Sequence, residues 1–129
     1  MVPIDWLAVG VSTVSAFVLG GLWYSPLLFA NAWMAGAKLT KEDAEKDMGA
    51  VFGQAILCAL ITAIAYGFFA SGMPLMQNLI AGVTTGFGLV AASLGLNYAF
   101  ERRPLSLLLI NGGYYVVQFA LYGLIFGLL

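Results

Sequence analysis

The sequence has no histidine and only one cysteine, Cys58. A single cysteine forms no disulfide within the chain and holds no cysteine-based metal cluster. Without histidine, imidazole metal sites, imidazole proton shuttles and Ser-His-Asp triads are absent as well. We therefore expect neither a cofactor nor an enzyme.

Charged residues are also scarce: they make up 9% of the 129 residues, whereas 62% are hydrophobic. A soluble domain has about a quarter of its residues charged, so this composition is typical of a protein that lies in lipid. The net charge is −1, and no basic stripe is present to attract nucleic acid. Membrane lipids are the partners that the composition predicts.

The few charges occur at three places: Asp5, the segment 38–47 and the cluster 101–103. The uncharged intervals between them reach the roughly 20 residues that a membrane-spanning helix needs. The sequence therefore predicts an all-α polytopic membrane protein, a single domain over 1–129. Its four transmembrane helices are expected at about 3–25, 48–70, 75–100 and 104–128. A short cytoplasmic interfacial, amphipathic segment is expected between the first two helices.

The lysines and arginines predict the orientation, because all five follow the first or the third helix: Lys38, Lys41, Lys46, Arg102 and Arg103. Cationic loops stay in the cytoplasm, so we expect a multi-pass protein of the cell (inner) membrane with both termini outside the cytoplasm. The first apolar run is read as a span and not as a cleaved signal peptide, since only the acidic Asp5 precedes its core.

The first predicted span ends in the stretch GLWYSP, residues 21–26. Its proline removes a helical donor, and the hydroxyl of Ser25 can satisfy the freed carbonyl of Leu22. Trp23 and Tyr24 are interpreted first as interfacial anchors, with a ligand site as the alternative. The sequence does not decide whether the helix bends or ends here. A capping box at Thr40 and Asp43 then predicts a solvated helix start before the second span.

Small residues recur at four-residue spacing on each predicted span, for example Ser12 with Ala16, and Gly82 with Gly86. Such stripes allow helix backbones to approach closely in lipid. Four helices offer few faces to fill all the stripes internally, so the pattern favours a homo-oligomer. The sequence GLWY also recurs as GLNY at residues 95–98, which favours a parallel repeat only weakly.

Polar residues concentrate on one face of the fourth predicted helix, at Asn111, Tyr114 (or Tyr115), Gln118 and Tyr122. Asn97 and Gln54 are expected to approach the start of this helix. Amides and phenols in lipid must face protein or water. Two hypotheses follow: hydrogen bonds between helices, or the lining of a cavity or pore that opens toward the arginines.

The charged cluster Glu101, Arg102 and Arg103 is expected at the cytoplasmic end of the third helix. Its arginines suit topology and anionic headgroups. They also suit the mouth of an anion path. Glu101 can pair with either arginine or with Lys46.

Three motifs carry a resemblance to a known family: GLWYSPLLF followed by Trp33, then FERRPL, then LLINGGY. In this order they resemble domain-of-unknown-function family 1761, small membrane proteins without an assigned activity. The resemblance covers essentially the whole chain and implies a four-helix membrane protein. It marks Trp23, Tyr24, Ser25, Pro26, Glu101, Arg102, Asn111 and Tyr114 as positions to test.

The sequence thus favours binding or passage of a small solute or ion, at a site lined by the fourth helix and the cytoplasmic arginines. The candidate residues are Trp23, Tyr24, Ser25, Asn97, Glu101, Arg102, Arg103, Asn111, Tyr114 and Gln118. One alternative is a structural or accessory protein that associates with other membrane helices. Another is a protein that binds anionic lipids.

Overall fold

The computed structural model describes residues 2–129, which form helices and connecting turns and contain no strand. Four helical spans are long and apolar enough to cross a membrane, as the spacing of the charges predicts. Three are single helices: α1 (Trp6–Trp23), α4 (Met48–Ala70) and α7 (Leu105–Leu128). The other span consists of α5 (Leu75–Val83), the π-helix η1 (Thr84–Ala91) and α6 (Ala92–Glu101). The chain is a multi-pass, all-helical membrane protein.

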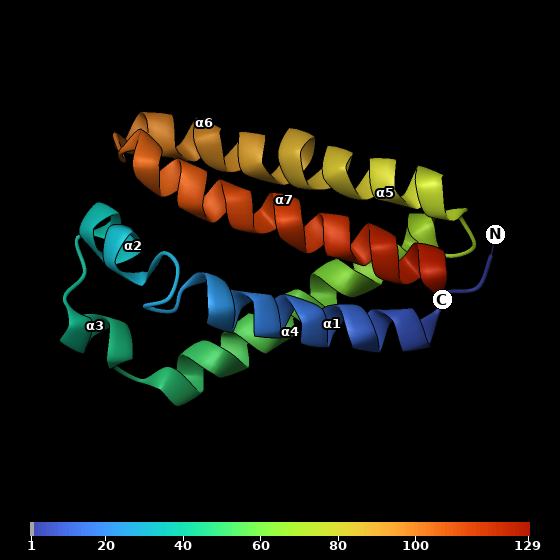
Figure 1. Ribbon diagram of the computed structural model, residues 1–129, viewed down its shortest axis with the longest axis horizontal. Coiled ribbons are helices and arrows are strands. Elements are labelled where there is room, and N and C mark those ends of the chain that lie inside the picture. The colour runs from blue at the N-terminus through green and yellow to red at the C-terminus, as the bar shows by residue number, and fades with distance from the viewer. Residues whose placement is uncertain (1) are drawn as a thin grey trace.

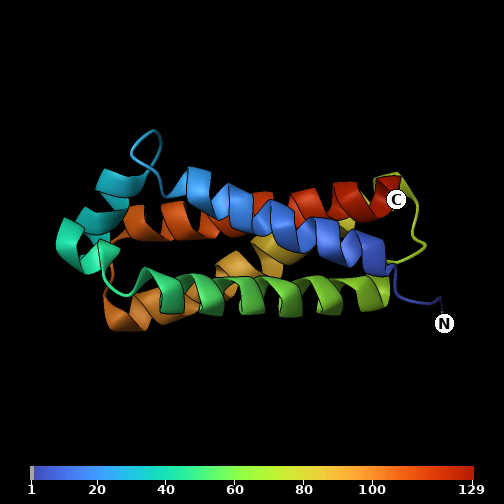
Figure 2. The ribbon, with the colours of Figure 1, turned by 90° about the horizontal axis from the view of Figure 1, so that it is seen from below.

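The spans run along one another, so the molecule has two ends (Figures 1 and 2). The terminal end holds both chain termini and the turn between α4 and α5. The charged end holds α2 (Ala30–Ala37), α3 (Lys41–Glu45) and the turn between α6 and α7. Among the described residues, every charged side chain except Asp5 belongs to the charged end.

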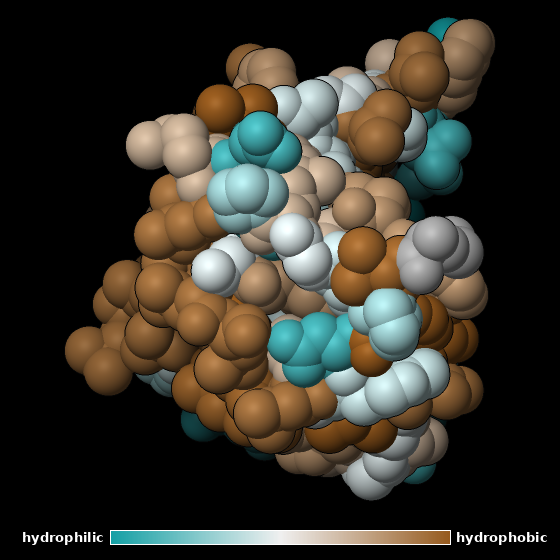
Figure 3. Space-filling view, turned by 90° about the vertical axis from the view of Figure 1, so that its right-hand side faces the viewer, coloured by the Kyte–Doolittle hydropathy of each residue, from teal (hydrophilic) through white to brown (hydrophobic). Residues whose placement is uncertain are grey.

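Large apolar side chains cover the outside of the spans; for example, Phe87 is 67% exposed and Phe100 is 81% exposed. In the view onto the terminal end, strongly apolar residues gather on one side, and pale or hydrophilic residues lie among them toward the centre and the other side (Figure 3). Soluble monomers rarely expose a continuous apolar surface of this kind. The surface matches the hydrocarbon of a bilayer, which offers no hydrogen bonds to polar groups.

The stretch GLWYSP ends α1; it does not bend it. The helix stops at Trp23, and the hydroxyl of Ser25 donates to the carbonyl of Leu22 at 2.6 Å, as the sequence predicts. The chain then turns back, so that α2 packs on the start of α7. A methyl group on Gly36 of α2 would lie 3.2 Å from Cβ of Leu107, which shows how closely the two helices approach.

The predicted capping box is present at the start of α3. The backbone N–H of Asp43 donates to the hydroxyl of Thr40 at 3.0 Å, and the N–H of Thr40 donates to the Asp43 carboxylate at 3.2 Å. Hydrogen bonding to its carboxylate, first by the Thr40 backbone N–H and then by the Thr40 side chain, lowers the pKa of Asp43. A short charged helix is thereby capped at the charged end.

A polar tie at the terminal end joins the beginning of the chain to its middle. The N–H of Asp5 donates to the hydroxyl of Ser71, in the turn after α4, at 3.0 Å. The carboxylate of Asp5 accepts from the N–H of Ala8 at 3.0 Å and so caps α1. The entry of the chain into α1 is therefore fixed by a residue 66 positions away.

Glycines allow α7 to lie directly against α5 and η1. A methyl group on Gly86 would lie 2.6 Å from the carbonyl oxygen of Tyr115, and one on Gly82 would collide with the carbonyl of Phe119. From the other side, a methyl group on Gly123 would collide with the carbonyl of Asn78. Backbone meets backbone along this interface, which only glycine permits at these positions.

The small-residue stripes are thus largely used within one chain. Besides the glycine interface, Ser12 and Ala16 of α1 are buried, as are Ala59 and Ala63 of α4, where these two helices pack together. The stripes therefore do not argue for an oligomer, although the sequence had favoured one on their account. Gly49 and Gly53 of α4 are the exception, since a methyl group there would meet nothing within 4 Å.

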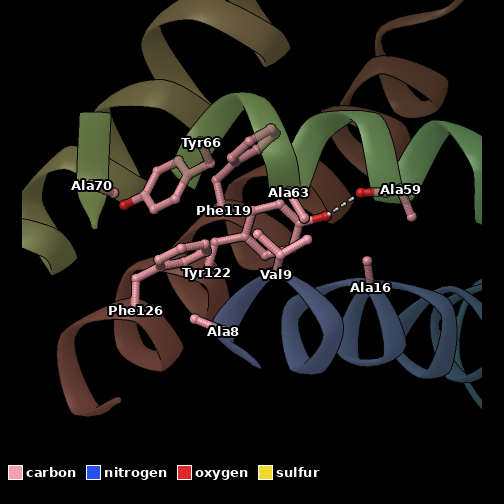
Figure 4. Close-up of a cluster of buried hydrophobic side chains, with 10 residues drawn as sticks. All are labelled: Ala8, Val9, Ala16, Ala59, Ala63, Tyr66, Ala70, Phe119, Tyr122 and Phe126. Carbon is pink, nitrogen blue, oxygen red and sulfur yellow. Dashed lines mark hydrogen bonds between the residues drawn. The ribbon is translucent and has the colours of Figure 1, made fainter. Parts of the chain in front are cut away.

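Aromatic rings fill the terminal half of the bundle (Figure 4). The ring centroid of Tyr66 lies 5.8 Å from that of Tyr122 and 5.4 Å from that of Phe126. The hydroxyl of Tyr66 donates to the backbone carbonyl of Asn78 at 2.9 Å, and the buried Asn78 amide donates to the carbonyl of Ala70 at 3.0 Å. This half is closed by packed rings around a satisfied polar centre.

The glycine interface predicts a contrast between two alanine substitutions on the same span. Gly82→Ala should lower the free energy of unfolding by about 1–3 kcal/mol, because the new methyl group collides with backbone that cannot move aside. Gly88→Ala is the control, since nothing lies within 4 Å of that position. Denaturant titration of both variants in mild detergent measures the difference; equal stabilities would contradict the interface.

Candidate functional site

The charged half of the bundle contains a cavity of about 980 Å³, bounded by α1, α4, α6 and α7 with α2 and α3 at its mouth. It exists because α4 leaves the bundle as it runs toward the charged end (Figure 1). Beyond Ala59, toward its start, α4 has no buried residue. One face of this half-helix lines the cavity, through Val51, Phe52, Ala55, Cys58, Ala59 and Thr62.

An amide of α7 holds two tyrosines together at one side of the cavity. The hydroxyl of Tyr24 donates to Oδ1 of Asn111 at 2.6 Å, and Nδ2 of Asn111 donates to the hydroxyl of Tyr98 at 2.7 Å. The three side chains form what we call the tyrosine clamp. It joins the end of α1 to α6 through α7, and all three residues line the cavity.

The clamp gives the echo between GLWY and GLNY a physical meaning. The last residue of each motif is one of the clamp tyrosines, Tyr24 or Tyr98. Each motif lies at the charged end of its span, and Asn111 bonds to both. The two short motifs therefore each supply a tyrosine to one amide, Tyr24 as the donor and Tyr98 as the acceptor.

Trp23, interpreted from the sequence as an interfacial anchor, also makes a hydrogen bond to protein. Its indole N–H donates to the carbonyl of Ile110 at 2.8 Å. The same is true of Tyr24, whose hydroxyl donates to Asn111 and whose ring lies 5.2 Å from that of Trp33. Both polar tips form hydrogen bonds between helices. A second bond, from the Tyr114 hydroxyl to the carbonyl of Ala16 at 2.7 Å, fastens α1 to α7.

The deep end of the cavity is formed by Gln118, which is only 3% exposed. Its Nε2 donates to the hydroxyl of Tyr122 at 2.9 Å and to that of Thr62 at 3.3 Å. Its Oε1 accepts no hydrogen bond from any described residue. Within residues 2–129, the only fully buried side-chain polar atom without a partner is Oγ of Ser12. Oε1 of Gln118 therefore keeps open surface, and that surface belongs to the cavity.

Tyr115 offers a second polar group without a partner. Its hydroxyl makes no hydrogen bond with any described residue, although its side chain lines the cavity. The Tyr98 hydroxyl accepts from Asn111 and so keeps its own proton for another acceptor. The cavity thus presents neutral donors and one amide acceptor on otherwise apolar walls.

Two of the predicted site residues, Asn97 and Ser25, lie outside the cavity lining, and so does Gln54. Asn97 is exposed on the outside of α6, one position from the tyrosine that points inward, and it does not line the cavity. Gln54, expected to approach the start of α7, is likewise exposed. Ser25 satisfies the carbonyl of Leu22 and has no direct part in the cavity. On α6 and α4 the cavity is instead lined by Tyr98 and Thr62, respectively, among other residues.

The charged cluster lies beside the cavity and does not line it. Glu101 pairs with Arg103 at 2.6 Å, as one of the predicted alternatives required. The guanidinium of Arg103 lies 5.4 Å from the ring centre of Tyr98, on which it stacks. Arg102 is exposed and donates to the carbonyl of Phe100 at 2.9 Å. Arg103 therefore contacts the tyrosine clamp through the ring of Tyr98, and neither arginine lines the cavity.

The electrostatics of the cavity are close to neutral. Of its lining residues only Lys41 and Glu45, both in α3 at the mouth, carry charge. Within residues 2–129, no group of three or more histidine, cysteine or acidic side chains is arranged to hold a metal ion. The cavity ends at Gln118 and Thr62, and the aromatic cluster fills the bundle beyond them. The space is a pocket, closed toward the terminal end.

Comparison with known proteins gives a family and nothing more specific. A family model described as "Protein of unknown function (DUF1761)" matches residues 7–127, and so includes all four spans and the cavity. The match confirms the resemblance indicated by the three sequence motifs. No curated protein and no solved structure matches the chain.

The tyrosine clamp predicts a graded loss of stability. Tyr24→Phe and Tyr98→Phe should each lower the free energy of unfolding by about 0.6 to 1.7 kcal/mol, the range measured for hydrogen bonds between membrane helices. Tyr115→Phe is the control, because that hydroxyl has no partner to lose. Combining each variant with Asn111→Leu in a double-mutant cycle measures the coupling. Fully additive effects would contradict the clamp.

Proposed function

We propose, for a chain that belongs to the DUF1761 family of unknown function, that the protein binds a small neutral molecule in the cavity of its charged half. The observation that carries the proposal is the pairing of apolar walls with polar groups that have no protein partner. Two of these groups are the Tyr115 hydroxyl and Oε1 of Gln118. A binding pocket typically has apolar walls with a few well-placed polar groups.

The size of the cavity supports binding of a compact molecule. Its volume of about 980 Å³ lies at the upper end of the range for small-molecule sites. Polar side chains with a purely structural role would have all their hydrogen bonds within the protein, as in the tyrosine clamp. The groups at the deep end are different, since an unpartnered amide oxygen in a membrane protein has a cost unless water or a ligand meets it.

Binding is better supported than passage of an ion. An ion path needs charged or carbonyl ligands along its length. Here the charged residues lie at the mouth, and the rings of Tyr66, Tyr122 and Phe126 close the far side. Anionic lipid binding has little specific support, because Glu101 already pairs with Arg103 and leaves Arg102 as the unpaired cation of this cluster.

The proposal includes an orientation, with the charged end in the cytoplasm by the positive-inside rule. In a Cys58→Ser background, a thiol from Lys46→Cys should react with a membrane-impermeant maleimide only after the cells are opened. A thiol from Leu129→Cys, at the terminal end, should react in cells with a permeable outer layer and an intact inner membrane. The reverse pattern would invert the assignment.

The binding proposal is tested by filling the cavity. Ala55 lines it, so Ala55→Phe places a ring inside, whereas Ala50→Phe adds the same ring to an exposed part of α4 outside the lining. Native mass spectrometry of protein released from mild detergent should show a reproducible extra mass on the wild type and on Ala50→Phe. We expect Ala55→Phe to retain at least about tenfold less of the bound molecule, since a ring in an occupied site costs about 1–3 kcal/mol.

The same spectra report the oligomeric state, which the sequence predicts as a homo-oligomer. Protein that is bare in all three forms would count against binding. An extra mass that survives Ala55→Phe unchanged would place the bound molecule outside the cavity.

A further inference from the structure

The cavity has a side that faces the bilayer. α4 packs on α1 and touches α7, but it makes no extended contact with α6 or η1. These helices form opposite walls, with Val51 and Phe52 on α4 and Leu94 on α6. Val51 is 50% exposed and Phe52 is 48% exposed, so no other helix covers this part of the α4 wall. Apolar side chains border this side of the cavity, which suits an apolar chain that reaches the cavity from the lipid.

The polar groups at the deep end select the head of such a molecule. Oε1 of Gln118 accepts a hydrogen bond, and the Tyr115 hydroxyl can donate or accept one. No charged side chain of the described residues lines this part of the cavity, because Lys41 and Glu45 lie at the mouth. A carboxylate or phosphate placed there would lose its hydration without gaining a partner charge. A hydroxyl head would gain both of the available hydrogen bonds, because it can donate to Oε1 of Gln118 and accept from the Tyr115 hydroxyl.

We infer that the ligand is a neutral single-chain amphiphile that reaches the cavity from the bilayer through the gap between α4 and α6. Its hydroxyl head lies between Tyr115 and Gln118, and its apolar chain passes Phe52 and Leu94 toward the lipid. This inference rests on the proposed binding function and adds the chemical class of the ligand and its route.

Cys58 provides a reporter inside the cavity, because it lines the cavity and is the only cysteine of the chain. In vesicles that contain the protein, 1-dodecanol should slow alkylation of Cys58 by N-ethylmaleimide. Dodecanoate at the same mole fraction should protect far less, because its head is charged. Butan-1-ol, with the same head and a short chain, should also protect far less. Native mass spectrometry of the dodecanol complex is a second readout that does not depend on the reactivity of Cys58.

Two variants separate specific binding from a general effect on the bilayer. Cys58→Ser with Leu57→Cys moves the thiol to the neighbouring position, which is 57% exposed and does not line the cavity. Dodecanol should leave its alkylation rate unchanged. Tyr115→Phe removes only a hydroxyl without a protein partner, so the fold should persist. Dodecanol should bind this variant about threefold to tenfold more weakly, as expected for one hydrogen bond.

The outcomes distinguish the inference from the binding proposal. Equal protection by dodecanoate would overturn the neutral head, and equal protection by butan-1-ol would overturn the chain and the route through the bilayer. Unchanged binding to Tyr115→Phe would overturn the placement of the head. Absence of both protection and a dodecanol complex would overturn the amphiphile, while the comparison of Ala55→Phe with Ala50→Phe would still decide separately whether the cavity binds anything.

Discussion

The contact of backbone with backbone between α7 and the third span is the constraint on which the rest of the structure depends. At Gly82, Gly86 and Gly123 there is no room for even one methyl group. In lipid, such close packing stabilises helix pairs where the hydrophobic effect does not. With α7 held in this way, its other faces meet α1 and α2. α4 packs on α1 and buries residues only from Ala59 onward, and the cavity lies beside its first half.

The polar residues of α7 divide into two groups with different roles. Asn111 and Tyr114 form hydrogen bonds to neighbouring helices, as the structural hypothesis predicts. Tyr115 and Gln118 line the cavity and retain hydrogen-bonding capacity. Residues that bond between helices and residues that line the cavity thus share one helix face. The arrangement is economical because the bonded residues fix the positions of the unbonded ones.

Much of the fold follows from the sequence because lipid imposes strict rules on charge and length. The spacing of charges gives the four spans, local hydrogen bonding gives the Thr40 capping box, and Ser25 with its following proline gives the end of α1. What cannot be read from the sequence is the rotation of each helix about its axis. One residue changes the direction of a side chain by about 100°. Because α6 is apolar around most of its circumference, the sequence does not show whether Asn97 or Tyr98 points into the bundle; packing places Tyr98 there. For the same reason the sequence does not show which helix each glycine stripe contacts. The π-helix η1 is also not predicted from the sequence.

The polar tie between Asp5 and Ser71 has a consequence for the order of events during synthesis. The first helix to be made finds its N-terminal partner only after 66 further residues have been added. At its other end, Trp23 and Tyr24 bond to residues of the last span that are synthesised 87 positions later. α1 therefore spends most of the chain's synthesis with its polar ends unmatched by protein. The final span completes the bundle and also matches the first helix, so a chain released early would lack the bonds that hold its own beginning.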